Sequence, residues 1–164
     1  MGNVIDRISA WAGIGVSWLV PVLILELVYD TAARYLFNAP TQWSYDISYM
    51  LYGLIFLVAA AYTLQKDQHV RIELLYDRLS SRGKAAIDCI GYILFFFPAL
   101  GALVAYGSIF AWKSWMLLET GNDSMWQPPI YPFKTVLPLA ALLLLLQGLV
   151  LFLRSLRTLI KGES

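Results

Sequence analysis

Four long apolar stretches constrain this chain more than any other feature of its sequence. They lie near residues 9–28, 45–64, 85–112 and 136–153, each close to or above the roughly 20 residues that a helix needs to cross a membrane. Only 14% of the 164 residues are charged, against about 25% in soluble domains. Because lipid offers the backbone no hydrogen-bond partners, such spans are helical. The sequence therefore predicts an all-α membrane protein with four transmembrane helices.

The spans and their connections use up the chain, which predicts one integral membrane domain over residues 1–164. The first apolar run is too long for a signal peptide and lacks a small-residue cleavage site, so we expect it to be retained. Proline removes a backbone donor and bends helices, so Pro21 and Pro98 predict irregular spans. Pro138 is expected near the first turn of the fourth span, where proline is tolerated.

Basic residues predict the orientation in the membrane. Nine of the twelve Lys and Arg residues fall at the two chain ends and in the connection between spans two and three. Lys and Arg accumulate in cytoplasmic loops, which predicts cytoplasmic N- and C-termini and outer loops near residues 30–43 and 113–135. The segment 70–82 is amphipathic, with arginines flanking its apolar face, and predicts a helix that lies on the lipid interface or packs on a partner subunit. Its lipid-interface candidates are Arg71, Arg78 and Arg82.

Glu26 is the most informative single residue, because a carboxylate within a span is costly and usually faces protein or water. Three readings stay open: solvation near the outer interface, a polar contact with another subunit, and a proton site. Gln147, inside the fourth span, is interpreted as a hydrogen-bonding contact between helices or between subunits, and a location near the cytoplasmic end of the span is the alternative. Asp46 opens the second span, where an acid favours the helix dipole, and a pairing with Arg34 is the alternative.

The second outer loop carries Glu119, Asp123 and Trp126, followed by several prolines. Prolines stiffen such a loop, and its side chains are candidates either for docking a partner or for a rigid cap. Cys89 is the only cysteine and His69 the only histidine, which leaves no metal-ligand cluster and no nucleophile–base pair. The sequence therefore favours a chain that is not an enzyme and that holds no metal or cofactor of its own.

The stretch between the first two spans resembles a known family. Residues 34–46 read RYLFNAPTQWSYD, and QHVRIE follows the second span at residues 68–73. This arrangement is similar to the small membrane subunit of TRAP transporters, the DctQ-like family, and the resemblance covers nearly the whole chain. That family often has two acids after the Trp, whereas here Trp43 is followed by Ser44, Tyr45 and Asp46, leaving one carboxylate.

The resemblance implies a multi-pass protein of the bacterial inner membrane that braces a large transport subunit of about a dozen spans. It also implies a periplasmic substrate-binding protein as a second partner, uptake of an organic acid or similar solute, and sodium bound by the large subunit. Partner-interface candidates are then Glu26, Arg34, Trp43, Asp46 and Gln147, and the docking candidates are Glu119, Asp123 and Trp126. Two other hypotheses remain: a small proton-coupled multidrug exporter that uses Glu26, and a membrane anchor of a redox complex.

Overall fold

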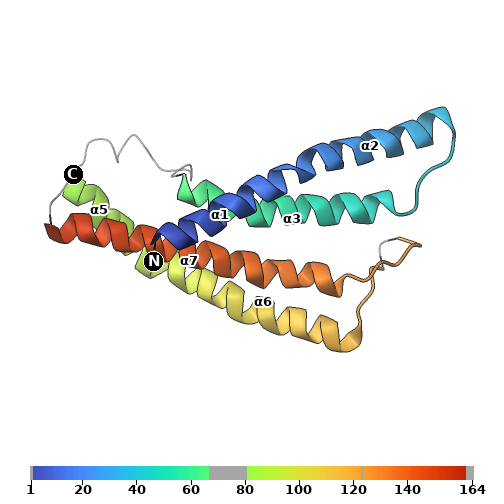
Figure 1. Ribbon diagram of the computed structural model, residues 1–164. Helices are drawn as coiled ribbons and strands as arrows, with labels where there is room; N and C mark the ends of the chain where they lie inside the picture. The colour runs from blue at the N-terminus through green and yellow to red at the C-terminus, as the bar shows by residue number, and fades with distance from the viewer. Residues whose placement is uncertain (1, 67–80, 123, 162–164) are drawn as a thin grey trace.

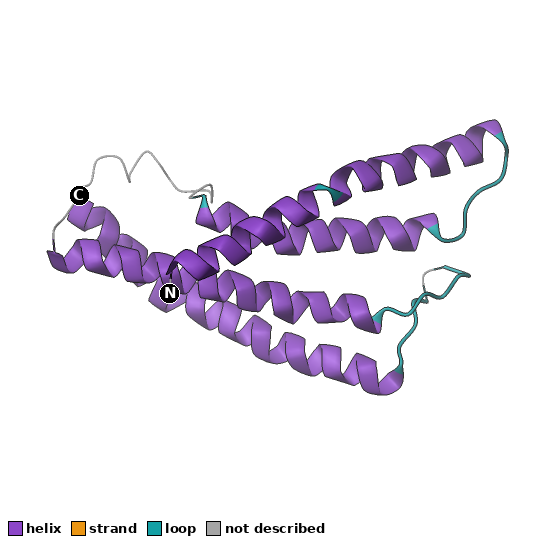
Figure 2. Cartoon of the chain, viewed as in Figure 1, coloured by secondary structure: helices purple, strands orange, loops and turns teal. Residues whose placement is uncertain are grey.

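The computed structural model describes residues 2–66, 81–122 and 124–161, and that part of the chain is helical apart from its two loops (Figure 2). An isolated bridge between Thr120 and Pro129 is the only strand-like pairing there. The elements in order are α1 (Gly2–Ser17), α2 (Leu19–Leu36), α3 (Ser44–Gln65), α5 (Ser81–Gly91), the π-helix η1 (Tyr92–Phe96), α6 (Phe97–Leu117) and α7 (Tyr131–Lys161).

Four helical segments are long and apolar enough to cross a membrane, which confirms the four predicted spans. They cover Val4–Leu36, Ser44–Gln65, Gly83–Leu117 and Tyr131–Ile160. Three of the four run well beyond the predicted limits, because polar residues at their ends continue the helix after the apolar run has stopped. The interfacial helix predicted at 70–82 lies outside the described residues except for the start of α5.

Helix α7 is the centre of the packing, since it contacts α6 and α3 extensively and α5 and α1 as well. Helix α2, in contrast, packs mainly on α3 and has no buried residue. Figure 1 shows the pair α2–α3 diverging from the pair α6–α7 toward the end that holds the loops. The bundle is therefore closed at the end that carries the chain termini and open at the other, the loop end.

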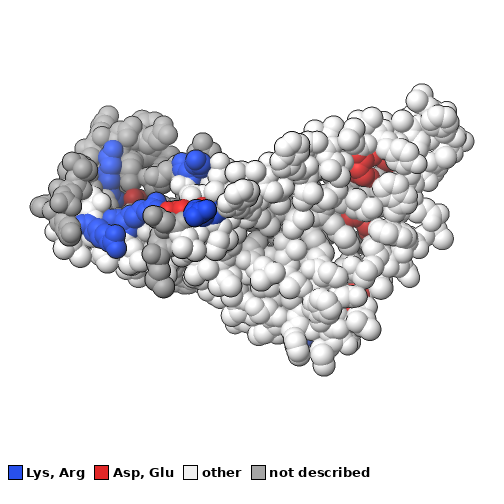
Figure 3. Space-filling model, viewed as in Figure 1, with Lys and Arg blue, Asp and Glu red and all other residues white. Residues whose placement is uncertain are grey.

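Lys and Arg side chains gather at the terminal end of the bundle on the face shown in Figure 3, while the middle of that face is uncharged. The described basic residues there are Arg7, Lys66, Lys84, Arg154 and Arg157, at the ends of α1, α3, α5 and α7. This separation of charge accords with the positive-inside rule. The cytoplasmic placement of both termini stays a prediction.

Two prolines coincide with helix irregularities, and a third occupies an unexpected place. The first span is interrupted at Trp18, one turn before Pro21, whose missing N–H leaves that turn without a donor. The π-helix Tyr92–Phe96 ends two residues before Pro98. The expectation for Pro138 was wrong: α7 begins at Tyr131, so Pro138 lies inside the helix. Pro132 occupies the opening turn instead, and Pro138 packs on α6 at Gly107.

Glycines allow helices to approach aromatic rings at three places in the bundle. A Cβ atom built on Gly148 of α7 would lie 2.1 Å from Phe96 Cε1, and one on Gly13 would lie 2.6 Å from Tyr62 Cβ. A Cβ atom on Gly53 would lie 2.7 Å from Phe133 Cζ. Gly101, which opens a small-residue pattern with Ala105, meets nothing within 4 Å. Close packing therefore depends on the first three glycines and not on Gly101.

We expect Gly148→Ala to destabilise the chain, because the ring of Phe96 would have to leave its packed position. Overpacking of this kind costs about 1–3 kcal/mol, so the midpoint of thermal unfolding in detergent should fall by several degrees. Gly101→Ala is the matched control and should unfold at or above the wild-type temperature, since alanine favours helix more than glycine does. Equal midpoints for both variants would contradict the packing described at Gly148.

Candidate functional site

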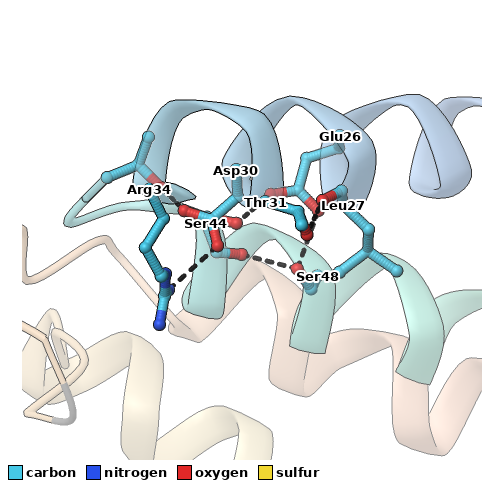
Figure 4. Close-up of polar contacts among 8 residues, drawn as sticks. Glu26, Leu27, Asp30, Thr31, Arg34, Ser44 and Ser48 are labelled. Atoms are coloured by element: carbon cyan, nitrogen blue, oxygen red, sulfur yellow. Dashed lines mark hydrogen bonds and ion pairs between the residues drawn. The ribbon is translucent and has the colours of Figure 1, made fainter. Parts of the chain in front are cut away.

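A polar seam joins α2 to α3 in the half of the bundle that carries the loops, which is called the outer half after the predicted orientation, and Figure 4 shows its side chains pointing toward one another. Both carboxylate oxygens of Glu26 accept hydrogen bonds from α3: Ser44 Oγ donates to Oε1 and Ser48 Oγ donates to Oε2 at 2.7 Å. The two serines lie one helical turn apart and so share the face of α3 that meets Glu26. The carboxylate within the first span is thus hydrogen-bonded inside the chain.

Asp30, one turn further along α2, extends this seam. Arg34 Nη2 lies 2.9 Å from Asp30 Oδ2, and Thr41 Oγ1 donates to the other oxygen. The alternative pairing of Arg34 with Asp46 was therefore wrong. Asp30 stands four residues from Arg34 on the same helix, which is the spacing at which side chains meet. The side chain of Arg34 remains 54% exposed.

Trp43 and Asp46 lie where α3 begins. The indole of Trp43 stacks on Tyr29 of α2, with ring centroids 6.0 Å apart. Asp46 is in the first turn of α3, as expected, but its side chain is buried and accepts a hydrogen bond from Ser124 Oγ. Asp46 therefore fastens the second outer loop to the start of α3.

The second outer loop is a short hairpin held at its base by an ion pair. Lys134 Nζ of α7 lies 2.6 Å from Glu119 Oε2 and 4.2 Å from the centroid of the Phe110 ring. Backbone bonds cross the hairpin from Ile130 N–H to Glu119 C=O and from Gly121 N–H to Pro128 C=O. The hydrogen bond from Lys134 lowers the pKa of the Glu119 carboxyl below its ordinary value of 4.5.

A second polar group, the inner polar cluster (Asp6, Ser9, Gln147 and Arg154), lies near the chain termini. Gln147 is completely buried; its Oε1 accepts from Ser9 Oγ at 2.9 Å, and its Nε2 donates to Asp6 Oδ1 at 2.8 Å. Arg154 donates to the other oxygen of Asp6. Of the readings of Gln147, the interhelical one is observed: it joins α7 to α1.

The predicted residues thus lie in three separate parts of the structure. Glu26, Arg34 and Trp43 line the contact between α2 and α3, Glu119 and Asp46 hold the outer loop, and Gln147 lies in the inner polar cluster. Trp126 is 48% exposed in the outer loop. Asp123, Arg71 and Arg78 and the side chain of Arg82 lie outside the described part of the chain.

Sequence reasoning missed the neutral and acidic partners that complete these contacts: Asp6, Ser9, Asp30, Ser44, Ser48 and Ser124. Hydroxyl residues are too common in membrane helices to be singled out one at a time. The signal available was the spacing of Ser44 and Ser48, which puts two donors on one face of the second span, after a first span that contains the acid Glu26. Among the described residues no group of three or more His, Cys, Asp or Glu side chains could hold a metal ion.

Comparison with known proteins finds a protein family that the chain matches. The sequence model of the family described as "Tripartite ATP-independent periplasmic transporters, DctQ component" matches residues 23–158. The chain is also similar to the sialic acid TRAP transporter small permease protein SiaQ of Vibrio cholerae serotype O1, with 24% identity over 110 residues. That similarity covers 66% of this chain and 63% of the relative. The matched family range contains the whole α2–α3 seam, whereas Asp6 and Ser9 precede it.

The ion pair at the base of the outer loop predicts a pH dependence. A carboxyl whose pKa is lowered by folding contributes stability that is fully present above its unfolded pKa and is lost as pH falls through the folded value. We therefore expect amide hydrogen exchange over residues 118–130, corrected for its intrinsic pH dependence, to rise once the pH falls below about 4.5.

The control for this measurement is Glu119→Gln, which keeps the shape of the side chain and removes its charge. The variant should show no such rise over the same pH range, because it has no ion pair to lose. An equal rise in both proteins would show that protonation of Glu119 does not govern the order of the loop.

Proposed function

The chain belongs to the DctQ family, the DctQ component of tripartite ATP-independent periplasmic transporters, and on that premise we propose that it is the small membrane subunit of a TRAP-type secondary transporter. It is a multi-pass protein of the inner membrane. In the proposed assembly this chain scaffolds a large membrane subunit, which carries out transport. The observation that carries the proposal is the family match over most of the chain, including all of α3, α6 and most of α2 and α7.

The polar contacts support a scaffold more than a transport pathway. A chain that moves a solute or an ion by itself needs polar groups that face a path through the membrane. In the described part of the chain, Glu26 is bonded to two serines, Gln147 to Ser9 and Asp6, and Asp30 to Arg34 and Thr41. The bonds of Glu26 and Gln147 hold helices together, and those of Asp30 hold the end of α2 and the loop that follows it, so the solute and sodium sites are assigned to the large subunit.

The outer loops support the second part of the proposal, that this subunit helps to dock a periplasmic substrate-binding protein. The hairpin is fixed at its base by Glu119 and Lys134 and fastened to α3 through Asp46 and Ser124. Its tip exposes Met125 and Trp126. Exposed aromatic and Met side chains on a rigid support are favourable for recognition by a protein partner. We propose sodium-coupled uptake of an organic acid or similar solute as the activity of the whole assembly.

The test is purification of the tagged chain in mild detergent from native membranes, with identification of what accompanies it by mass spectrometry. We expect a stoichiometric hydrophobic protein of about a dozen spans, the number that the family resemblance implies. Isolation of this chain without any such protein, from membranes that also contain the binding protein, would overturn the proposal.

Asp46→Ala is expected to lower the yield of that complex, because loss of the hydrogen bond to Ser124 releases the outer loop from α3. The hydroxyl of Ser124 would be left without its charged acceptor, at a cost of about 1–3 kcal/mol. Thr31→Ala, a change at an exposed position whose hydroxyl bonds only to the Leu27 carbonyl of its own helix, is the control and should give the wild-type yield. Wild-type recovery of the complex with Asp46→Ala would refute the assigned role of Asp46.

The exporter hypothesis makes the opposite prediction for the purified chain. If Glu26 exchanged a drug for a proton, this chain alone in liposomes would release protons when a cationic drug is added. We expect no drug-dependent proton flux, because both oxygens of Glu26 are occupied by Ser44 and Ser48. A flux that is present in the wild type and absent in Glu26→Gln would establish the exporter instead.

A further inference from the structure

One face of α3 carries a row of exposed aromatic side chains, the aromatic ridge: Tyr45, Tyr49, Tyr52 and Phe56. Their spacing of four, three and four residues places them on one side of the helix, and each is between 59% and 65% exposed. The row extends for about 17 Å along the helix, which is more than half the thickness of a hydrocarbon core of about 30 Å. It therefore reaches well below the interface where tyrosines facing lipid are normally found.

A groove runs along each side of this ridge. The groove between α2 and α3 has a volume of about 460 Å³ and is lined by Leu23 and Leu27 and, nearer the loop end of α2, by Asp30 and Arg34. The groove between α3 and the pair α6–α7 has a volume of about 550 Å³ and is lined by Phe110, Phe133 and Leu137. Tyr49 and Tyr52 border both grooves. The ridge and its grooves thus form one continuous surface at the open end of the bundle.

The polar chemistry of this surface argues for protein and against lipid as its cover. No described residue accepts a hydrogen bond from the hydroxyl of Tyr45, Tyr49 or Tyr52, and a hydroxyl that faces hydrocarbon without a partner is costly. The tyrosines of the ridge therefore call for a neighbour with hydrogen-bonding side chains. Helices that pack in membranes supply such groups across their interface.

The charges of the same region are unbalanced. Three carboxylates lie along α2 and at the start of α3, those of Glu26, Asp30 and Asp46, and Arg34 is the one cation among the described residues that pairs with any of them. Hydrogen bonds from serines and a threonine satisfy oxygens but do not neutralise charge. In a medium of low dielectric constant the excess negative charge favours a cationic neighbour.

We propose that the aromatic ridge and its two grooves form the surface that packs against transmembrane helices of a large membrane subunit, and that the helix beside Tyr45 brings a Lys or Arg side chain to the carboxylates. This inference rests on the proposed function, which supplies the partner. It adds the face of the chain and the chemistry of the contact. Polar complementarity selects a protein helix with a basic side chain over lipid, and the negative excess disfavours a second copy of the same face.

Site-specific photocrosslinking in native membranes tests the proposal. A photoreactive benzoylphenylalanine replaces Tyr45, Tyr49 or Tyr52 one at a time, because it preserves the aromatic character of the site. The matched control is Trp112 of α6, which is aromatic and 67% exposed and borders a different groove, together with Trp115 and Leu139. Crosslinked products are identified by mass, and the crosslinked peptides are sequenced.

We expect covalent adducts with the large subunit from all three tyrosine positions and at least tenfold less adduct from Trp112. The peptide captured at Tyr45 should come from a membrane helix that contains Lys or Arg within two turns of the crosslinked residue. A dimer of this chain, adducts with lipid alone, or a captured helix without a basic residue would each overturn the proposal. So would a stronger adduct at Trp112 from an intact complex.

Purification of the unmodified complex distinguishes a failure of the proposed function from a wrong assignment of the contact face. When the large subunit co-purifies with the unmodified chain but crosslinks only from Trp112, the proposed function stands and the assigned face is wrong. When no large subunit co-purifies with the unmodified chain, the proposed function has failed, and the proposed contact face then has no partner.

Discussion

The buried side chain of Gln147 is the interaction on which the arrangement of the helices depends. A completely buried polar amide must be hydrogen-bonded within the chain, because neither lipid nor water reaches it. Ser9 and Asp6 supply the partners, and both belong to the first turns of α1. The N-terminal helix is thereby tied to α7, the helix that contacts nearly all the others. With α1 fixed in this way, α3 packs against both, and Gln65 at its end donates to the Asp6 carbonyl at 2.9 Å.

The outer half of the bundle lacks an equivalent of this cluster between the two helix pairs. There α2 does not pack on α7; it is held to α3 by the bonds of Glu26 and by the stacking of Tyr29 on Trp43, and to the connection before α3 by the bond from Thr41 to Asp30. Interhelical hydrogen bonds in membranes contribute on average about 0.6 kcal/mol each. A few such bonds keep α2 beside α3 but bury little of either helix. The open end therefore follows from where the polar contacts lie, and not from any shortage of apolar residues.

Hydropathy alone predicted the number of spans, because the cost of exposing polar groups to lipid leaves little freedom in the helical content of such a chain. It failed at the helix ends and at Pro138, where tertiary packing on Gly107 and an opening turn with Pro132 outweigh the usual preference of proline. Position in the sequence did indicate that Asp46 opens a helix and that Glu26 and Gln147 need partners. It did not identify those partners, because Ser9, Ser44, Ser48 and Ser124 come from other helices or loops. Arg34 shows the same limit. Asp30 and Asp46 were both possible partners, and which of them Arg34 pairs with depends on where α2 ends.

The residue range of the family match can be compared with the positions of the polar contacts in the bundle. The matched range begins within α2 and includes the α2–α3 seam and the outer loop, whereas the residues of α1 that bind Gln147 precede it. The matched range therefore covers Gln147 and Arg154 as well as the outer half, and the internal tie at the terminal end joins that range to the residues of α1 that precede it. A subunit that acted alone would have reason to close its outer half. A subunit that braces a larger protein needs the opposite, a terminal end that is stable by itself and an outer half whose remaining apolar and polar surface is completed by the protein it supports.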